Sequence, residues 1–261
     1  FFSYISPTNI MSCTRPCSIR GSNLTDTGFN SFDGYLYINL DSRPDRRKAI
    51  ERLLDDMGVS GEKRMRLPAV AEAQNGHLGC VRSHIKAVKL AKAAGWQNVM
   101  ILEDDFKFSK SPPEVDSTLS TALRHLPPDW DVIQIGYSSA RLEPESVAAV
   151  ARRTRHAMSS SAYAVNAHFY DRLLSEFTES ERLLELDGAR FDHVYCTPFA
   201  LDQQWKGLQE SSKWYTISPA IGMQDPAQGS DIMAQFWQLH PSCQQWWDRE
   251  LPQPKPPGSG S

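Results

Sequence analysis

Three consecutive carboxylates are the residues of this sequence best suited to chemistry. Glu103, Asp104 and Asp105 directly follow the apolar run 98–102 without a spacer. Two carboxylates one residue apart beyond a strand point toward one side, where they can share a divalent cation with a ligand phosphate. Glu103 and Asp105 are therefore candidate metal ligands, and Asp104 is expected to face elsewhere or to support them. The alternative is an acidic surface turn, and the local pattern leaves both interpretations open.

A group of arginines after the strand-like segment 35–40 is the second candidate. Arg43, Arg46 and Arg47 crowd the first turn of an expected helix, where the helix dipole makes positive charge slightly unfavourable. Such a penalty indicates an anionic partner, either a pyrophosphate or a facing carboxylate. The alternative is a solvated helix face with i,i+4 pairs such as Arg47 with Glu51. Spacing alone favours this second interpretation.

The segment 75–84 combines glycines with a Ser-His pair. Gly76 and Gly79 allow a ligand or another segment to approach the backbone closely. Ser83 and His84 are adjacent, and neighbouring residues on a helix point in different directions, so they cannot form the hydrogen bond of a nucleophile and its base. The sequence has no GxSxG elbow either. These observations exclude a serine hydrolase of that kind.

The elements that must position these residues alternate between strand and helix. Strands are predicted at 35–40, 98–102, 130–137 and 160–166, and helices within 43–58, 76–95, 116–126, 167–177 and 198–208, with the basic run 152–156 ending a further helix. This alternation predicts an α/β fold with a mostly parallel sheet flanked by helices. In open sheets of this type ligands bind beyond the carboxyl ends of the strands, which is where the acidic triplet lies.

Composition and punctuation suggest one folded unit between two irregular ends. Residues 1–33 are predicted to be an arm or stalk remnant, 34–245 a single catalytic domain, and 246–261 a tail rich in Pro, Gly and Ser. The 28 Lys and Arg against 31 Asp and Glu leave a net charge of -3, which gives no reason to expect nucleic acid as a partner. No apolar run approaches the roughly 20 residues of a membrane span.

The cysteines do not resolve the cellular compartment. The five cysteines match no zinc-binding spacing, and a disulfide between Cys13 and Cys17 stays open. The tripeptide 23–25 fits the N-glycosylation pattern, which matters only in a secretory protein. The sequence begins at Phe1 rather than at Met, so we expect that a targeting segment could precede it in the full protein. We expect the lumen of the ER or Golgi, with the cytoplasm as the alternative.

Six segments, in order over about 200 residues, resemble the signature segments of glycosyltransferase family 25. They are "YINLDSRPDRR", "GHLGCVRSH", "MILEDDF", "SSSAYAVNAHFYDRLL", "ALDQQW" and "ISPAIGMQDPAQGSDI". That family contains lipooligosaccharide β-galactosyltransferases and collagen hydroxylysine galactosyltransferases. The resemblance implies a GT-A fold in which a DxD-like motif holds Mn²⁺, or Mg²⁺, against the diphosphate of a nucleotide sugar. Here the motif is Glu-Asp-Asp, and "DQQW" replaces a common Leu-Pro after the aspartate.

Carried over by position, the resemblance also assigns residues to roles. Glu103 and Asp105 would contact the metal and diphosphate, with Asp104 near the ribose or donor sugar, and Asp202 near the acceptor as general base. The nucleotide would be bordered by Asn39, Leu40, Arg43 and Arg46, the donor pocket lined by Gly79, Ser83 and His84, and the diphosphate covered by a loop with Gln224, Ser230 and Asp231.

The resulting expectation is a metal-dependent, inverting glycosyltransferase. It would move a sugar, in the first instance galactose, from a UDP-sugar to a hydroxyl of a glycan or glycoprotein. A catalytically silent GT-A domain that serves as a binding or scaffold module is the alternative. A metal-dependent phosphohydrolase would need further acidic or His ligands at nearby strand ends, and the late candidates His193 and Asp202 show no recognisable arrangement. The acceptor and the choice between galactose and glucose are not encoded in any motif.

Overall fold

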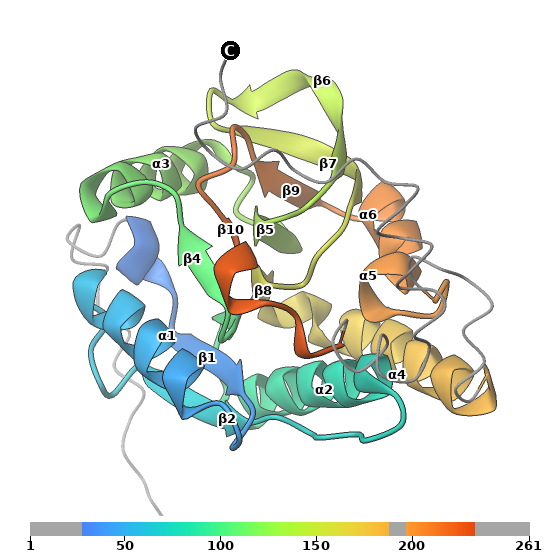
Figure 1. The fold of residues 1–261 in the computed structure, drawn as a ribbon. Coiled ribbons are helices and arrows are strands. Elements are labelled where there is room, and N and C mark those ends of the chain that lie inside the picture. The colour runs from blue at the N-terminus through green and yellow to red at the C-terminus, as the bar shows by residue number, and fades with distance from the viewer. Residues whose placement is uncertain (1–27, 188–196, 233–261) are drawn as a thin grey trace, which may run out of the picture.

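The computed structural model describes residues 28–187 and 197–232, and these form one sheet covered by helices on both faces (Figure 1). The strands of this ten-stranded sheet are β1 (Gly34–Asn39), β2 (Arg64–Pro68), β3 (Asn98–Glu103), β4 (Phe106–Phe108), β5 (Val132–Gly136), β6 (Ala140–Ala148), β7 (Ala151–Ala157), β8 (Ala162–Asn166), β9 (Trp214–Ile217) and β10 (Gly222–Gln224). The main order is β2-β1-β3-β8-β5-β9-β7-β6, and β10 joins β5 to β4.

Most strands of the main path point in one direction. β2, β1 and β3 pair in parallel, as do β5 and β9, whereas β8 runs antiparallel to both β3 and β5. Because β8 is antiparallel to each of its neighbours, β3 and β5 point the same way. The predicted α/β class, with a mostly parallel sheet flanked by helices, is confirmed.

The helices divide between the two faces of the sheet. Their bounds are α1 (Pro44–Asp56), α2 (Gly76–Ala94), α3 (Pro112–His125), α4 (Tyr170–Asp187), α5 (Leu201–Gln204) and α6 (Lys206–Ser211), with short 3₁₀ turns η1 (Gly28–Ser31), η2 (Ala167–Phe169) and η3 (Pro226–Gln228). Alternate residues of β1 and β3 supply two separate cores, as a strand's period of two requires. Tyr35 and Met100 pack with α1 and α3, while Leu36 and Ile101 pack with α2 and α4.

The helix boundaries near the acidic triplet follow from local chemistry. Pro44 opens α1, where its missing N–H costs nothing. Asn75 caps α2 by accepting a hydrogen bond from the Leu78 N–H, and Gly95 ends it with a φ of 71°, a left-handed conformation that glycine adopts at no steric cost. Both predicted helices are therefore present, with α2 ending at the expected glycine.

Three expectations differ from the structure. The basic run 152–156 lies in strand β7 rather than in a helix, because Ala151, Thr154 and Ala157 are buried on the sheet while Arg155 is exposed. The expected arm 1–33 extends too far: Phe29 is 0% and Phe32 is 1% exposed in the core beside α1 and α3. The predicted helix 198–208 is divided into α5 and α6, which meet at Trp205.

Some expectations fall on residues that the structure does not describe. They are the glycosylation tripeptide 23–25, the pair Cys13 and Cys17, His193 and the tail 246–261. Among the described helices, none is long and apolar enough to cross a membrane.

Candidate functional site

A cavity of about 360 Å³ lies beyond the carboxyl ends of β1 and β3. The amino-terminal turns of α1 and α2 and the segment after β10 enclose it. Its lining includes nearly all of the predicted site: Leu40, Arg46, Gly79, Ser83, His84, Glu103, Asp104, Asp105, Gln224, Ser230 and Asp231. Residues from distant parts of the sequence thus meet at one edge of the sheet, as expected for an open α/β fold.

Arg46 is the central cation of the cavity. Its Nη1 lies 3.2 Å from Asp104 Oδ1, 3.2 Å from Asp105 Oδ2 and 3.0 Å from Asp231 Oδ2. Its Nη2 donates to the backbone oxygens of Gln228, at 3.2 Å, and Gly229, at 2.7 Å. The Arg46 side chain is 5% exposed, so these charges interact with little solvent screening. Arg46 therefore joins the acidic triplet to the segment that follows β10.

The arginine cluster was expected either to face an anionic partner or to form i,i+4 pairs on a solvated helix face, and the structure shows each arrangement for a different residue. Arg47 forms the i,i+4 pair with Glu51, at 2.9 Å on the exposed side of α1. Arg46 instead faces carboxylates in the cavity, and Arg43 donates to Asp231 Oδ1 at 2.7 Å. The position of the arginines at a helix amino terminus is explained by these carboxylates.

Asp104 does not face away from Asp105. Both carboxylates contact the same guanidinium, and Asp104 Oδ2 also accepts a 2.6 Å hydrogen bond from Asn39 Nδ2. Asn39 itself is buried and is held by Arg66, whose Nε donates to Asn39 Oδ1 at 2.9 Å. Asn39 therefore acts on the cavity through Asp104 rather than by lining it.

Asp105 has an unsatisfied oxygen. Its Oδ2 accepts from Gln224 Nε2 at 2.9 Å, whereas Oδ1 is buried without a hydrogen-bond partner among the described residues. Burial, followed by the negative charge of Glu103, raises the pKa of Asp105 to about 7. The Nε of Arg46 is likewise buried without an acceptor in the described part of the chain. Because buried polar groups normally find partners, an acceptor and a donor on two contacting side chains, both without a partner among the described residues, fit a ligand that brings both a cation and an anion.

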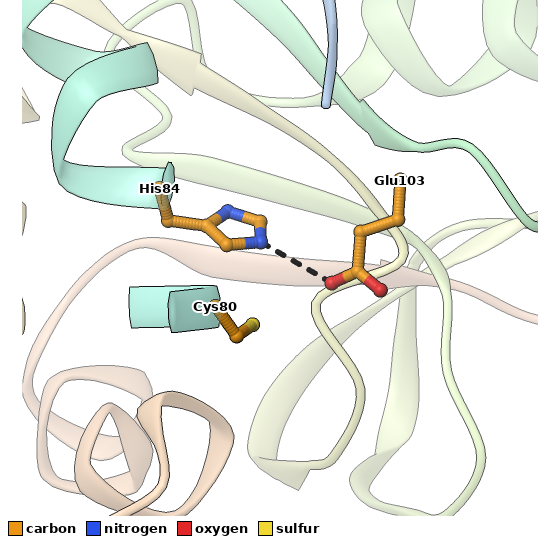
Figure 2. Close-up of side chains that lie close together, drawn as sticks. All are labelled: Cys80, His84 and Glu103. Carbon is orange, nitrogen blue, oxygen red and sulfur yellow. Dashed lines mark hydrogen bonds and ion pairs between the residues drawn. The ribbon is translucent and has the colours of Figure 1, made fainter. Parts of the chain in front are cut away.

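Glu103 has a different set of partners. Its Oε1 lies 3.2 Å from His84 Nε2 and accepts a hydrogen bond from Ser160 Oγ. Burial alone would raise the pKa of Glu103, but the hydrogen bond and charge of His84 lower it below the usual range. Figure 2 shows the His84 ring directed at this carboxylate, with Cys80 one helical turn before His84.

The glycine and serine of α2 have structural roles. A Cβ on Gly79 would lie 2.5 Å from the Val70 carbonyl oxygen, so only glycine allows the segment before α2 to pass this closely. Ser83 Oγ donates to Gly79 O at 2.7 Å and accepts from Val70 N at 2.8 Å. Ser83 is thus engaged with the backbone rather than paired with His84 as a nucleophile with its base, which agrees with the exclusion of a serine hydrolase.

Asp202 and Arg43 are not part of the cavity lining among the described residues. Asp202 lies in the first turn of α5, and its Oδ2 accepts a 2.9 Å hydrogen bond from the Ser159 N–H. Ser159 has a φ of 82°, a strained value for a residue with a side chain. Asp202 thus holds the loop that carries Ser160 to Glu103.

The segment after β10 closes one side of the cavity. Gln224, Ser230 and Asp231 all line it, and the Asp225 N–H donates to the Asp105 carbonyl oxygen at 2.7 Å. Figure 1 shows this orange-red segment, with β10 and η3, lying in front of β8 and close to β4. This segment therefore lies beside the acidic triplet, and its contact with a diphosphate stays a prediction.

Sequence reasoning did not identify every residue of the cavity. Cys80 and Glu72 line it, and Ser160 contacts Glu103. The spacing of Cys80 and His84 was an available signal, since residues four apart on a helix share a face.

The residues present fit a hard divalent cation. The three carboxylates of the acidic triplet line the cavity together with those of Glu72 and Asp231, and oxygen ligands suit Mg²⁺ and Mn²⁺. The unpartnered Asp105 Oδ1 gives such a cation an oxygen that no described group of the protein uses.

Comparisons with known proteins give distant structural similarities. No family model matches the chain, and no curated protein sequence matches it. A mannose-1-phosphate geranyltransferase from Thermus thermophilus is 11% identical, with 74% of this chain and 73% of that chain covered and a TM-score of 0.42. A glycosyltransferase involved in glycosylation of the major capsid of PBCV-1 is 8% identical, covering 77% and 96%, with a TM-score of 0.45. Mouse xyloside xylosyltransferase 1 is 10% identical, covering 75% and 85%, with a TM-score of 0.30. Similarity at this level does not decide the fold family or the function.

Proposed function

We propose that this chain is a metal-dependent glycosyltransferase with a GT-A fold, similar to family 25. It transfers a sugar, in the first instance galactose, from a UDP-sugar to a hydroxyl of a glycan or glycoprotein, with inversion. The observation that carries the proposal is the cavity at the carboxyl ends of β1 and β3, where Asp104 and Asp105 meet Arg46. Asp105 and Arg46 each keep a buried polar atom that has no partner among the described residues. The order of six signature-like segments supports the finer assignment.

In this proposal Glu103 and Asp105 hold Mn²⁺ or Mg²⁺. The bound cation supplies Lewis-acid stabilisation of the diphosphate that leaves the sugar. Asp104, held by Asn39 and Arg46, lies on the side of the ribose or donor sugar. Leu40 borders the nucleotide while Asn39 acts on it through Asp104, and Gly79, Ser83 and His84 border the donor.

The arginines contribute charge to the diphosphate. Arg46 has an Nε–H with no acceptor in the described part of the chain, and its guanidinium is already positioned by three carboxylates and two backbone oxygens. A guanidinium that is fixed before the substrate arrives stabilises developing negative charge without the cost of reorganisation. Arg43, through Asp231, ties this arrangement to the segment with Gln224 and Ser230.

Asp202 is the proposed general base. Inversion requires a base on the face of the sugar opposite the leaving group, and one carboxylate is enough. Its Oδ2 is held by the Ser159 N–H, which orients the carboxylate and leaves Oδ1 to accept a proton from the acceptor hydroxyl. No carboxylic acid would be needed for the leaving group, unlike in glycoside hydrolases, because a diphosphate held by a cation would not require protonation to leave.

One observation favours the second candidate, a silent GT-A domain that binds ligands without turnover. Arg46 already contacts both Asp104 and Asp105, so a cation must share the carboxylates with a resident guanidinium. A silent domain of this kind would bind nucleotides without a metal, whereas the enzyme would need Mn²⁺ for binding and transfer.

A panel of UDP-sugars separates these two candidates. Thermal unfolding of the full chain is followed with each UDP-sugar, with Mn²⁺ or with EDTA, and release of UDP is measured in parallel. We expect one UDP-sugar to raise the melting temperature and to be hydrolysed slowly, only when Mn²⁺ is present. Metal-independent stabilisation without UDP release would replace the enzyme with the silent domain, and no response to any UDP-sugar would overturn both.

A further inference from the structure

We propose that Cys80, His84 and Glu103 form a second metal site, suited to Zn²⁺ or a cation of similar softness. One ligand atom from each residue lies within 4.8 Å of the other two, and all three residues line the cavity. Figure 2 shows the thiol, the imidazole and the carboxylate gathered around one space. This inference does not rest on the proposed transferase activity.

The two elements that carry the ligands are rigid. Cys80 and His84 are four residues apart on α2, so both side chains lie on one face of the helix. Glu103 is the last residue of β3, a strand paired on both sides in the sheet. The approach of the three groups is therefore set by packed secondary structure and not by a loop.

His84 is oriented in the way that metal-binding histidines are. Its Nδ1 lies 2.7 Å from the Tyr163 hydroxyl, and both side chains are buried. With Nδ1 occupied in this way, Nε2 is the nitrogen that faces Glu103. Histidine ligands of metals are typically held by such a bond from the second ring nitrogen, which fixes the ring and its tautomer.

Glu103 is supported in a similar way by Ser160. The Ser160 hydroxyl donates to Glu103 Oε1, and the Ser159 N–H next to it is anchored by Asp202. A carboxylate that is itself hydrogen-bonded keeps its direction when a metal binds. The strained conformation at Ser159 is thus accompanied by a hydrogen bond from the next residue, Ser160, to Glu103 at the end of β3.

The donor set distinguishes this site from the carboxylate site. A thiolate, an imidazole and one carboxylate oxygen suit Zn²⁺, whereas the pair Glu103 and Asp105 offers only oxygen, which suits Mn²⁺ and Mg²⁺. Three protein ligands leave a fourth position open toward the cavity, as in zinc sites that bind water or a substrate oxygen. The ligand in that position would be a water or an oxygen of the molecule bound in the cavity.

Metal binding here releases the thiol proton of Cys80 together with any proton that His84 carries on Nε2. The Cys80 thiol loses its proton to solvent and binds as thiolate, and Glu103 binds as the ionised carboxylate. His84 binds through neutral Nε2, with its ring proton on Nδ1 donated to the Tyr163 oxygen. Glu103 is common to both sites, so Zn²⁺ in this site is expected to weaken Mn²⁺ binding by Glu103 and Asp105.

Cobalt is the probe, because a thiolate bound to Co²⁺ absorbs in the near ultraviolet. The reduced, chelator-treated full chain is titrated with Co²⁺, and then with Zn²⁺ to displace it. We expect one equivalent of Co²⁺ to give a thiolate charge-transfer band that Zn²⁺ abolishes. Cys80→Ser should remove the band, and His84→Gln should weaken Co²⁺ binding about tenfold or more.

Matched variants show whether the thiolate band comes from Cys80 and whether Tyr163 supports the site. The variant that combines Cys13→Ser, Cys17→Ser, Cys196→Ser and Cys243→Ser should retain the band, because Cys80 is then the remaining cysteine. Tyr163→Phe should keep the band but weaken binding about 10–100-fold, as expected for loss of an orienting partner. Each variant is checked for unaltered circular dichroism before titration.

Two results would overturn the proposal: no charge-transfer band in the wild type, or the same band in Cys80→Ser. Asp105→Asn separates this test from that of the proposed function. It should leave the Co²⁺ band unchanged while Mn²⁺-dependent binding of UDP is lost. A chain that binds UDP with Mn²⁺ and shows no Co²⁺ band would refute the second site alone.

Discussion

Replacing Arg46 by Met tests how the acidic triplet is stabilised. Met keeps an unbranched side chain but removes the guanidinium that contacts Asp104 and Asp105. The side chains of these two aspartates are 8% and 4% exposed. Removing one partner of a buried ion pair leaves an uncompensated charge, which costs about 3–5 kcal/mol. Against a total stability of about 5–15 kcal/mol, this is a large fraction.

The assay is thermal and urea unfolding of the wild type and the variant without divalent cations. A loss of about 3–5 kcal/mol corresponds to a drop in melting temperature of roughly 6–20 °C for a chain of this size. The control is Arg47→Met on the next residue of α1, whose pair with Glu51 is on the surface. Exposed i,i+4 pairs contribute about 0.3–0.5 kcal/mol, so the control should unfold within about 2 °C of the wild type.

Mn²⁺ should then rescue Arg46→Met more than it stabilises the wild type. Without the guanidinium, the charges of Asp104 and Asp105 lose the group that balances them, so a divalent ion that binds only the folded state restores stability. The gain is about 2.7 kcal/mol at a concentration about 100 times the dissociation constant. If Arg46→Met loses no more stability than Arg47→Met, or if Mn²⁺ gives it no extra gain, the charge balance described for this cavity is wrong.

Three further outcomes follow from particular residues. Gly79→Ala should lower the free energy of unfolding by about 1–3 kcal/mol, because the new Cβ would lie 2.5 Å from Val70 O. The control is Gly207→Ala on helix α6, where a Cβ would meet no described atom within 4 Å, and it should raise the free energy of unfolding by up to about 1 kcal/mol. Equal melting temperatures of the two variants would contradict this prediction. Asp202→Asn should lower turnover far more than donor affinity, and equal losses in both would argue against a base. Asp105→Asn should abolish Mn²⁺-dependent transfer while the unfolding curve is retained, and an unchanged rate would remove this residue from the metal site.

Much of the central sheet could be predicted because its strands are continuous apolar runs. β1, β3 and β5 are buried on both faces, so their sequences contain few polar residues. Strand direction is not encoded in such a run, which is why the antiparallel course of β8 was not foreseen. β7 was missed for another reason: its arginines obscure the small buried residues that face the sheet.

The position of the candidate site in the fold could be predicted from the sequence, whereas the hydrogen bonds and ion pairs within it could not. Strand ends and a resemblance to known segments placed Glu103, Asp104 and Asp105 together with the loop of Asp231. That Arg46 faces three carboxylates depends on tertiary structure, since the segment after β10 comes from far along the chain. The group of Cys80, His84 and Glu103 was not predicted, because zinc sites are recognised in sequences by repeated Cys and His pairs. Here the third ligand, Glu103, comes from strand β3 and not from the same segment as Cys80 and His84.

The central claim is that this cavity binds a nucleotide diphosphate together with a divalent cation. Calorimetric titration of UDP into the full chain, with Mn²⁺ and then with EDTA, tests it most directly. We expect one UDP to bind per chain with Mn²⁺ and none with EDTA, and we expect Asp105→Asn to lose the Mn²⁺-dependent binding. Equal binding with and without Mn²⁺, or no binding under either condition, would contradict it.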